Sequence, residues 1–279
     1  QRVHDLSWAA GDAQAKGFLI GATSGKTTLN GEGLQHQDGH SHILSSTIPN
    51  CLSYDPAYAY EVAVIVKDGI QKMYIDQENY FYYITTINEN YVHPEMPKGS
   101  EEGIIKGMYR IQDSVAPAVR LLGSGAILNE AIKAAAILKK YEIDSEIWSV
   151  TSFNLLRKNG MEVERLNQLN PLNENKHTYV EKCFEQNEIP TIAATDYMRA
   201  YAEQIRPYIK GEYITLGTDG YGRSDSRETL RDFFEVDCES IARAAIYTLF
   251  QEGQITEAQI KKIYKDLKVD PNKPNPWQV

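Results

Sequence analysis

Residues 119–138 read VRLLGSGAILNEAIKAAAIL, and this stretch decides the fold class of the chain. It opens with the apolar run Val119–Leu122, which is typical of a buried strand, and the Gly-Ser-Gly that follows turns the chain. The apolar side chains after the turn keep the 3-4-3 spacing of one buried helix face; they are Leu128, Ala131, Ala135 and Leu138. Asn129 is a residue type that can cap such a helix. The stretch predicts a strand, a tight turn and a helix.

Strands and helices continue to alternate toward the C-terminus. The expected elements are strands at 146–150, 191–194 and 213–216 and helices at 197–206 and 240–250. Gly253 can stop the second of these helices, and Thr256 with Gln259 forms the capping box of a last one. Strands that alternate with helices predict a mostly parallel sheet covered on both faces, which is an α/β fold.

The part before residue 119 is organised differently. The expected elements are a helix through residues 1–21, a strand at 50–54, a helix at 57–73 and a strand at 80–87. Residues 103–111 are expected to form a short connecting element, and DSVAPA at 113–118 is the best linker candidate. We therefore expect two parts, residues 1–112 and 119–279. Because the chain opens on Gln1 inside an expected helix and without a methionine, we interpret its start as a cut edge.

Composition limits the class of protein. The 279 residues are 42% hydrophobic and 24% charged, which is typical of a globular protein with room for two cores. The net charge of -9 has no clustered basic stripe to offset it, which argues against a nucleic-acid or anionic-membrane partner. No apolar run approaches the roughly 18 to 20 residues of a membrane helix. Three distant cysteines without a CxxC pair favour reduced thiols in a cytosolic chain.

The strongest candidate for a site is TTLNGEGLQHQDGHSHILS at residues 27–45, which we name the histidine segment. It is polar, contains three glycines and lies between two apolar runs. Its chemistry-bearing residues are His36, His40, His42, Glu32 and Asp38. Because its backbone and ring nitrogens need partners near a core, a site is a better interpretation than a simple connection.

The histidine segment admits a metal interpretation. The spacing His36-x3-His40-x-His42, with Asp38, offers nitrogen and oxygen ligands in one short stretch. No second cluster of acids or histidines has a matching spacing, so we give a metal site little weight. A histidine that acts as acid, base or hydrogen-bond donor needs only placement and a pKa near neutrality.

Two glycine-rich motifs resemble nucleotide loops without completing them. GATSGKT at 21–27 has three residues between its glycines where the phosphate-binding loop has four, so we expect it to end a helix and begin the histidine segment. LLGSGAIL at 121–128 lacks the third glycine of a dinucleotide-binding turn. A tight turn from strand to helix explains that motif.

A second polar stretch is GTDGYGRSDSRETLRDFFEVD at residues 217–237. One interpretation is a helix N-terminus capped by Ser226 or Asp225. The other is an anion or subunit contact through Arg223 and Arg227. We favour a role in interface structure.

Long runs of the chain carry a family resemblance. The longest is TSGKTTLNGEGLQHQDGHSHILSSTIPNCLSYDPAYAYEVAVIVKDG at 23–69, and shorter ones are YITTINENY, LLGSGAIL, SVTSF, ATDYM and LGTDGYGRSDSRETLRDFFEVD. These runs closely resemble the homodimeric, thiamine-diphosphate-dependent first component of bacterial pyruvate dehydrogenase complexes. The resemblance extends over essentially the whole chain.

The resemblance implies a transketolase-like α/β fold. Residues 1–112 would be the end of the pyrimidine-binding domain, and residues 119–279 the C-terminal three-layer α/β domain with a mostly parallel sheet. The cofactor-domain signature is absent, and the glutamate that activates the aminopyrimidine would precede Gln1. Thiamine diphosphate and magnesium would be bound mainly by a part of the enzyme outside this chain, so the resemblance assigns no cofactor-binding residue and no metal ligand here.

The resemblance also implies a site. His36 would line the active-site cavity as the catalytic residue and contact the substrate bound to thiamine. Glu32 and His40 would lie at the substrate channel, although His40, like His42, looks more structural. A placed N–H donor would stabilise developing oxyanion and carboxylate charge, and the opening of the lipoyl disulfide needs a proton source.

The expected activity is pyruvate decarboxylation with reductive acetylation of the lipoyl group. The resemblance implies a cytoplasmic homodimer whose partners are pyruvate and the dihydrolipoyl acetyltransferase core with its lipoyl domain, and neither nucleic acid nor membrane. We expect the chain alone to be inactive. Two alternatives stay open: a non-catalytic dimerisation and assembly module, and a metal-dependent hydrolase built on the histidine segment.

Overall fold

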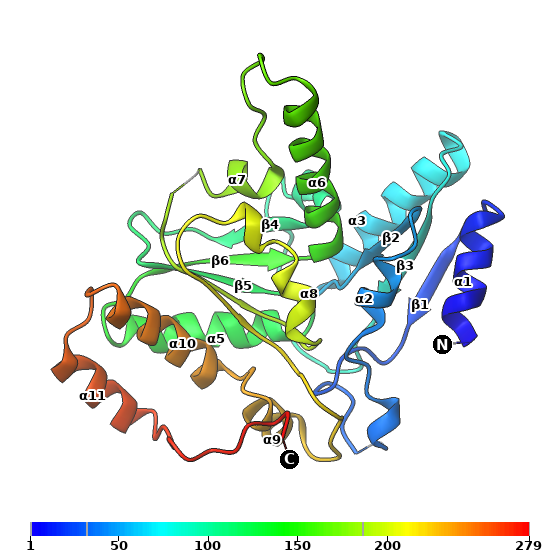
Figure 1. Ribbon diagram of the computed structural model, residues 1–279. Helices are drawn as coiled ribbons and strands as arrows, with labels where there is room; N and C mark the ends of the chain where they lie inside the picture. The colour runs from blue at the N-terminus through cyan, green and yellow to red at the C-terminus, as the bar shows by residue number, and fades with distance from the viewer. Residues whose placement is uncertain (1, 32, 186, 279) are drawn as a thin grey trace.

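The computed structural model describes residues 2–31, 33–185 and 187–278, which build two sheets (Figure 1). The smaller sheet has three parallel strands in the order β1-β3-β2. Its strands are β1 (Phe18–Gly21), β2 (Cys51–Tyr54) and β3 (Phe81–Thr85). Its helices are α1 (Arg2–Asp12), the short α2 (Ser41–Ser45) and α3 (Ala59–Ile70), which continues as the π-helical turn η2 (Gln71–Ile75).

The larger sheet has five strands in the order β4-β6-β5-β7-β8. They are β4 (Met108–Gln112), β5 (Val119–Gly123), β6 (Ser145–Val150), β7 (Thr191–Ala194) and β8 (Tyr213–Leu216). Only β4 runs antiparallel to its neighbour. The expected mostly parallel sheet is confirmed.

Helices cover both faces of the larger sheet (Figure 1). On one face lie α5 (Ile127–Lys139) and α10 (Cys238–Gln251), and on the other α6 (Phe153–Leu169), α7 (Tyr179–Cys183) and α8 (Arg199–Glu203). Leu121 belongs to the first core and Leu122 to the second, because neighbouring strand residues point to opposite faces. The three-layer α/β architecture follows from this alternation.

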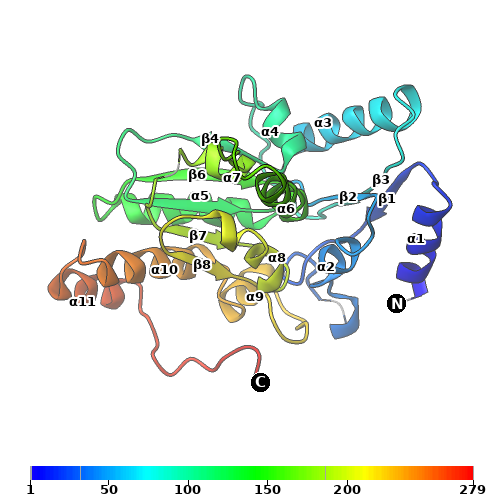
Figure 2. The same ribbon diagram turned by 45° about the horizontal axis from the view of Figure 1, so that its top comes forward.

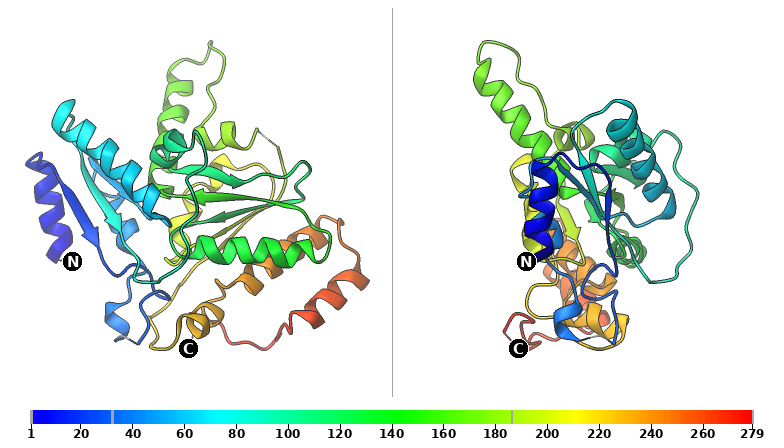
Figure 3. Two further views of the ribbon diagram at one scale, coloured as in Figure 1. Left: turned by 180° about the vertical axis from the view of Figure 1, so that it is seen from behind. Right: turned by 90° about the vertical axis from the view of Figure 1, so that its right-hand side faces the viewer.

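The remaining elements complete the described chain. They are α4 (Glu101–Lys106), α9 (Arg227–Phe233), α11 (Glu257–Asp266) and the 3-10 turns η1 (Leu34–His36) and η3 (Arg206–Tyr208). Seen from behind, α1 stands at one end of the molecule and α11 at the other (Figure 3). No helix among the described residues has the length and apolar character needed to cross a membrane.

Most expected elements are confirmed within a few residues. All five strands expected at 50–54, 80–87, 146–150, 191–194 and 213–216 are present. Thr256 and Gln259 form the predicted capping box of α11, Ser226 caps α9 and Gly253 follows α10 at φ +73°. Asn129 is no cap: α5 begins at Ile127, so Asn129 lies in its first turn.

The N-terminal expectation of one helix through residue 21 is wrong. Helix α1 ends at Asp12, and Phe18–Gly21 forms a strand because it pairs with β3 in the register Phe18↔Tyr82. GATSGKT therefore follows a strand instead of ending a helix.

The expected linker at 113–118 runs between β4 and β5 of the same sheet. Residues 108–112, which the sequence suggested belong with the first part, pair with β6 of the larger sheet. The residues expected to form one short connecting element are the end of α4 and β4.

A buried carboxylate joins the two sheets. Glu61 on α3 accepts hydrogen bonds at Oε1 from the Tyr109 hydroxyl (2.7 Å) and the Ser149 hydroxyl (2.6 Å). Its Oε2 accepts the amides of Ala57 (2.5 Å) and Tyr58 (3.0 Å). Because all four donors satisfy one fully buried group, Glu61 fixes α3 against β4 and β6.

Candidate functional site

The structure separates the three histidines of the histidine segment by environment. His36 closes the turn η1 and is exposed, and its amide donates to the Gly33 carbonyl at 3.0 Å. His40 is also exposed, whereas His42, on α2, is completely buried. Glu32 lies outside the described residues. Among the described residues, no group of three or more His, Cys, Asp or Glu side chains is placed to hold a metal ion.

His42 belongs to a buried polar chain between the sheets. Its Nε2 lies 3.2 Å from the Thr85 hydroxyl oxygen, and that hydroxyl donates to Asp55 Oδ1 at 2.7 Å. While Asp55 is ionised, the Thr85 hydroxyl donates to it, and His42 Nε2 then carries the proton shared with Thr85. The imidazole stacks on the Tyr201 ring at 4.8 Å and meets the Tyr197 ring edge-on at 4.7 Å.

Burial shifts the pKa values of the two groups at the ends of this hydrogen-bonded chain, His42 and Asp55. It lowers the pKa of His42 to about 4 and raises the pKa of Asp55 to about 7. In both cases the low-dielectric surroundings disfavour the charged form. His42 is therefore a neutral imidazole near pH 7, and its role among the three histidines is explained by packing in the core.

The start of the histidine segment is attached to the larger sheet. Asp196 follows β7, and its carboxylate accepts the Thr27 amide (2.9 Å), the Thr28 amide (3.2 Å) and the Thr28 hydroxyl (2.8 Å). The buried Lys26 ammonium donates to the carbonyl oxygens of Thr218 and Gly220. Burial lowers the pKa of Lys26, against the opposite effect of nearby carboxylates. These contacts bring together residues almost two hundred positions apart.

The middle of the segment is attached through Gln37. Its Oε1 accepts the Arg223 amide at 2.8 Å, and its Nε2 donates to the carbonyl oxygens of Arg223 and Leu29. The side-chain amide thus pairs with one backbone residue of the 217–237 stretch in both directions. This fixes the residue directly after His36.

Arginines of the 217–237 stretch support the same attachment. Arg227 Nε donates to the Thr28 carbonyl at 2.8 Å. The buried Arg231 contacts the carboxylates of Glu89 and Glu130 and donates to the Thr27 hydroxyl at 3.4 Å. The structure shows Arg227 and Arg231 in contacts within the chain, and an anion or subunit contact through Arg223 and Arg227 stays a prediction.

Sequence analysis missed the residues that hold the segment, namely Lys26, Gln37, Asp196 and Arg231. A weak signal existed for Asp196, because polar residues just after a parallel strand gather at the carboxyl edge of the sheet. The other contacts depend on how distant loops meet, which no local pattern reports.

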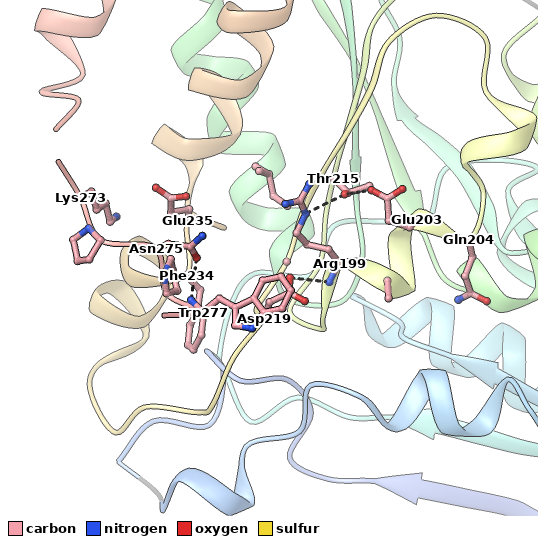
Figure 4. A pocket seen from close by; sticks show the side chains of 15 residues that line it. Arg199, Glu203, Gln204, Thr215, Asp219, Phe234, Glu235, Lys273, Asn275 and Trp277 are labelled. Atoms are coloured by element: carbon pink, nitrogen blue, oxygen red, sulfur yellow. Dashed lines mark hydrogen bonds between the residues drawn. The ribbon is translucent and has the colours of Figure 1, made fainter. Parts of the chain in front are cut away.

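A separate cleft of about 710 Å³ lies on the other side of the 217–220 turn. Figure 4 shows it between α8, β8 and the C-terminal segment, which supplies Trp277. Arg199 Nε donates to the Thr215 hydroxyl there at 3.3 Å. Figures 1 and 2 both show the C-terminal segment returning from α11 toward α9, where Lys273 Nζ contacts Asp232 at 2.7 Å. None of the three histidines of the segment is among the residues that line this cleft.

The comparisons with solved structures define the class. Transketolase from Campylobacter jejuni superposes with a TM-score of 0.66 at 15% identity, covering 86% of this chain and 33% of that one. Transketolase from Pichia stipitis with sedoheptulose-7-phosphate gives a TM-score of 0.65 at 16% identity, covering 90% of this chain and 33% of that one. The fold is transketolase-like, as expected.

Sequence comparisons show which proteins of that class the chain is similar to. Residues 1–94 match the model of the pyruvate dehydrogenase E1 component middle domain, and residues 107–237 match the transketolase-like C-terminal domain. The pyruvate dehydrogenase E1 components of Pseudomonas aeruginosa and Escherichia coli K12 are 54% and 53% identical over 281 residues. Each alignment covers 99% of this chain and 32% of the relative. The resemblance is confirmed: over its whole length this chain is similar to a C-terminal part of pyruvate dehydrogenase E1 components, and it spans about a third of their length.

Proposed function

We propose that this chain is the part of a pyruvate dehydrogenase E1 component that carries and positions His36 for pyruvate decarboxylation and lipoyl acetylation. The observation that carries the proposal is the sequence identity of 51% to the E1 component of Cupriavidus necator over 100% of the chain, the histidine segment included. The described geometry supports it, because His36 is exposed while the residues around it are fixed by buried contacts.

His36 is suited to two proton tasks. A ring N–H that points to solvent or a cavity can donate to an oxyanion or carboxylate, and a protonated imidazole can supply the proton that opens a lipoyl disulfide. The turn η1 and the Gln37 contacts hold the backbone around His36, which supports a proposal in which the imidazole is positioned before substrate arrives.

Thiamine diphosphate and magnesium are part of the proposal as cofactors held elsewhere. The described residues provide no group of three metal-ligating side chains, so they do not fit the metal. When bound, thiamine diphosphate supplies the chemistry that breaks the carbon–carbon bond of a 2-oxo acid. We assign its binding groups to a part of the enzyme outside this chain.

Homodimerisation, the acetyltransferase core with its lipoyl domain as partner, and a cytoplasmic location also belong to this proposal. They rest on the family resemblance. Glu32 and His40 are proposed as substrate-channel residues, and the exposed position of His40 in the same segment is compatible with that role.

A chimaeric enzyme tests the proposal. Residues 1–279 would replace the matching 32% of the Escherichia coli E1 component, and pyruvate turnover with a lipoyl-domain acceptor would be measured. The His36→Ala variant should lower kcat by about 10²-fold or more, the usual contribution of a placed acid or base. The matched control is His177→Ala, a half-exposed histidine before α7, which should leave turnover unchanged. Equal turnover in the chimaera and its His36→Ala variant would refute the role of His36.

The second candidate is an assembly module that supplies protomer surface without binding cofactor. It is favoured by the short span of the match, because the chain covers only 32% of the length of its relative. The His36→Ala variant of the chimaera separates the two candidates, because a module without a catalytic residue predicts unchanged turnover. Titration calorimetry of the 279-residue chain with thiamine diphosphate and magnesium tests what both candidates predict, which is no tight binding. Tight binding by this chain alone would contradict both the module and our assignment of the cofactor to other parts.

A further inference from the structure

A short loop, residues 29–38, begins and ends at the same place in the fold. Before it, the Lys26 amide donates to the Asp196 carbonyl at 3.3 Å. After it, the Met198 amide donates to the Gly39 carbonyl at 2.9 Å. Both ends of the loop are therefore tied to one turn at the carboxyl end of β7.

The Asp196 side chain makes the larger part of this attachment. Its two oxygens accept three hydrogen bonds from Thr27 and Thr28, and the carboxylate is buried. Hydrogen bonds to an ionised group are about twice as strong as neutral ones. Gly25 permits the close approach: it adopts φ +80°, and an added Cβ would lie 2.1 Å from Asp196 Oδ2.

Two buried cations, Arg231 and Lys26, lie near Asp196. Arg231 donates to the Thr27 hydroxyl and opposes the rise that burial causes in the pKa of Asp196. The Lys26 ammonium is held by the 217–220 turn and also feels the Asp196 carboxylate. The attachment is a cluster of buried opposite charges, in which removal of one charge leaves its partners without part of their compensation.

We propose that Asp196 is a positioning residue for His36: its carboxylate closes the base of the loop 29–38 and so holds the imidazole in place. This inference rests on the proposed function, in which His36 acts in pyruvate turnover. Asp196 itself touches the backbone of Thr27 and Thr28 and reaches His36 only through the loop.

The test compares two buried carboxylates in the chimaeric enzyme. Asp196→Asn keeps the side-chain volume but places an NH2 group against a donor of Thr28. Part of the hydrogen bonding that closes the loop 29–38 is therefore lost. Amide hydrogen exchange in residues 29–39 should become about tenfold faster, and kcat should fall about tenfold or more, since a misplacement of about 1 Å can cost about 10²-fold. The ring signal of His36, assigned by its loss in His36→Gln, should shift or broaden.

Glu61→Gln is the matched control. Glu61 is equally buried and accepts four hydrogen bonds, but none comes from the histidine segment. It should lower the melting temperature without changing kcat or exchange in residues 29–39. A merely structural Asp196 would behave in the same way.

Failure of this inference can be told apart from failure of the proposed function. Unchanged exchange and kcat in Asp196→Asn overturn the inference. Faster exchange with unchanged kcat also overturns it, and His36→Ala then decides whether the proposed function fails as well. If Asp196→Asn is not recovered folded, Thr28→Val removes only the hydroxyl donor to Asp196, and unchanged exchange in that variant has the same meaning.

Discussion

Replacing Asp55 with asparagine should make the free energy of unfolding rise with pH across the mildly acidic range, whereas that of the unchanged protein stays nearly level. Asp55 and His42 are two buried groups of the same polar chain, and burial shifts their pKa values in opposite directions. Their contributions to the pH dependence of stability therefore largely cancel. The variant removes one of them.

The magnitudes follow from the two pKa values. Burial raises the pKa of Asp55 to about 7 from 3.8, so its contribution to stability is lost as the pH rises through that window. Burial lowers the pKa of His42 to about 4 from 6.5, so its contribution is gained as the pH rises from about 4 to 6.5. At about 1.4 kcal/mol per pH unit, the two contributions approach about 4 and about 3 kcal/mol with opposite signs.

The neighbours of both groups stay in place in the variant. The carboxylates of Asp196 and Glu61 raise the pKa of Asp55 further, and hydrogen bonds from the hydroxyls of Thr85 and Ser124 lower it. The Asp38 carboxylate raises the pKa of His42 and so opposes the effect of burial. Titrating groups that do not face Asp55 act equally in both proteins, so the difference between the two pH slopes reports Asp55 together with its coupling to Asp196 and Glu61.

Urea unfolding followed by tryptophan fluorescence at about pH 4.5 and 6.5 measures that difference. The Asp55→Asn variant should gain about 2 to 3 kcal/mol over this range, and the unchanged protein less than about 1 kcal/mol. His42→Gln, which keeps an N–H donor toward Thr85, should show the opposite slope. Parallel slopes in Asp55→Asn and the unchanged protein would refute the reasoning.

Two further predictions concern packing. Gly123→Ala should cost about 1 to 3 kcal/mol in urea unfolding, because an added Cβ would lie 2.5 Å from the Leu128 Cα, whereas Gly253→Ala, with open space around it, should cost only about 1 kcal/mol for its φ. Equal costs would contradict this. Arg231→Met should cost about 3 to 5 kcal/mol, because it leaves the Glu130 carboxylate buried without one of its cations, and a midpoint within error of the unchanged protein would contradict the ion-pair argument.

The larger sheet could be predicted because its signals are local. The stretch 119–138 carries a strand run, a glycine turn and a helical spacing within twenty residues, and the structure has β5 and α5 there. Strand β1 was missed because FLIG is apolar in every position and directly follows a helical pattern. Its pairing with β3, more than sixty residues away, decides its conformation.

The place of β4 could not be predicted for a similar reason. Its five residues precede a linker-like stretch, and only the antiparallel pairing of Met108 with Val150 assigns it to the larger sheet. Local composition marks where a chain turns, but it does not report which sheet a strand joins.

The histidine segment could be singled out because histidines, acids and glycines are concentrated there. Which of its histidines is buried and which are exposed could not be predicted from spacing alone. His42 differs from His36 and His40 because α2 turns it inward against Tyr197 and Tyr201, which lie more than 150 residues later in the chain. The role of His36 itself rests on the family resemblance.

The contacts of the segment explain why a transketolase-like C-terminal domain accompanies this site. Loop 29–38 is too short and too rich in glycine to hold a conformation by itself, because each glycine adds backbone freedom that folding must remove. Its order comes from Asp196 at the base and from Arg223, which pairs with Gln37 beside His36. Since both residues belong to the larger sheet and its loops, the contacts that hold the backbone of this segment depend on the folding of a part of the chain that does not itself carry His36.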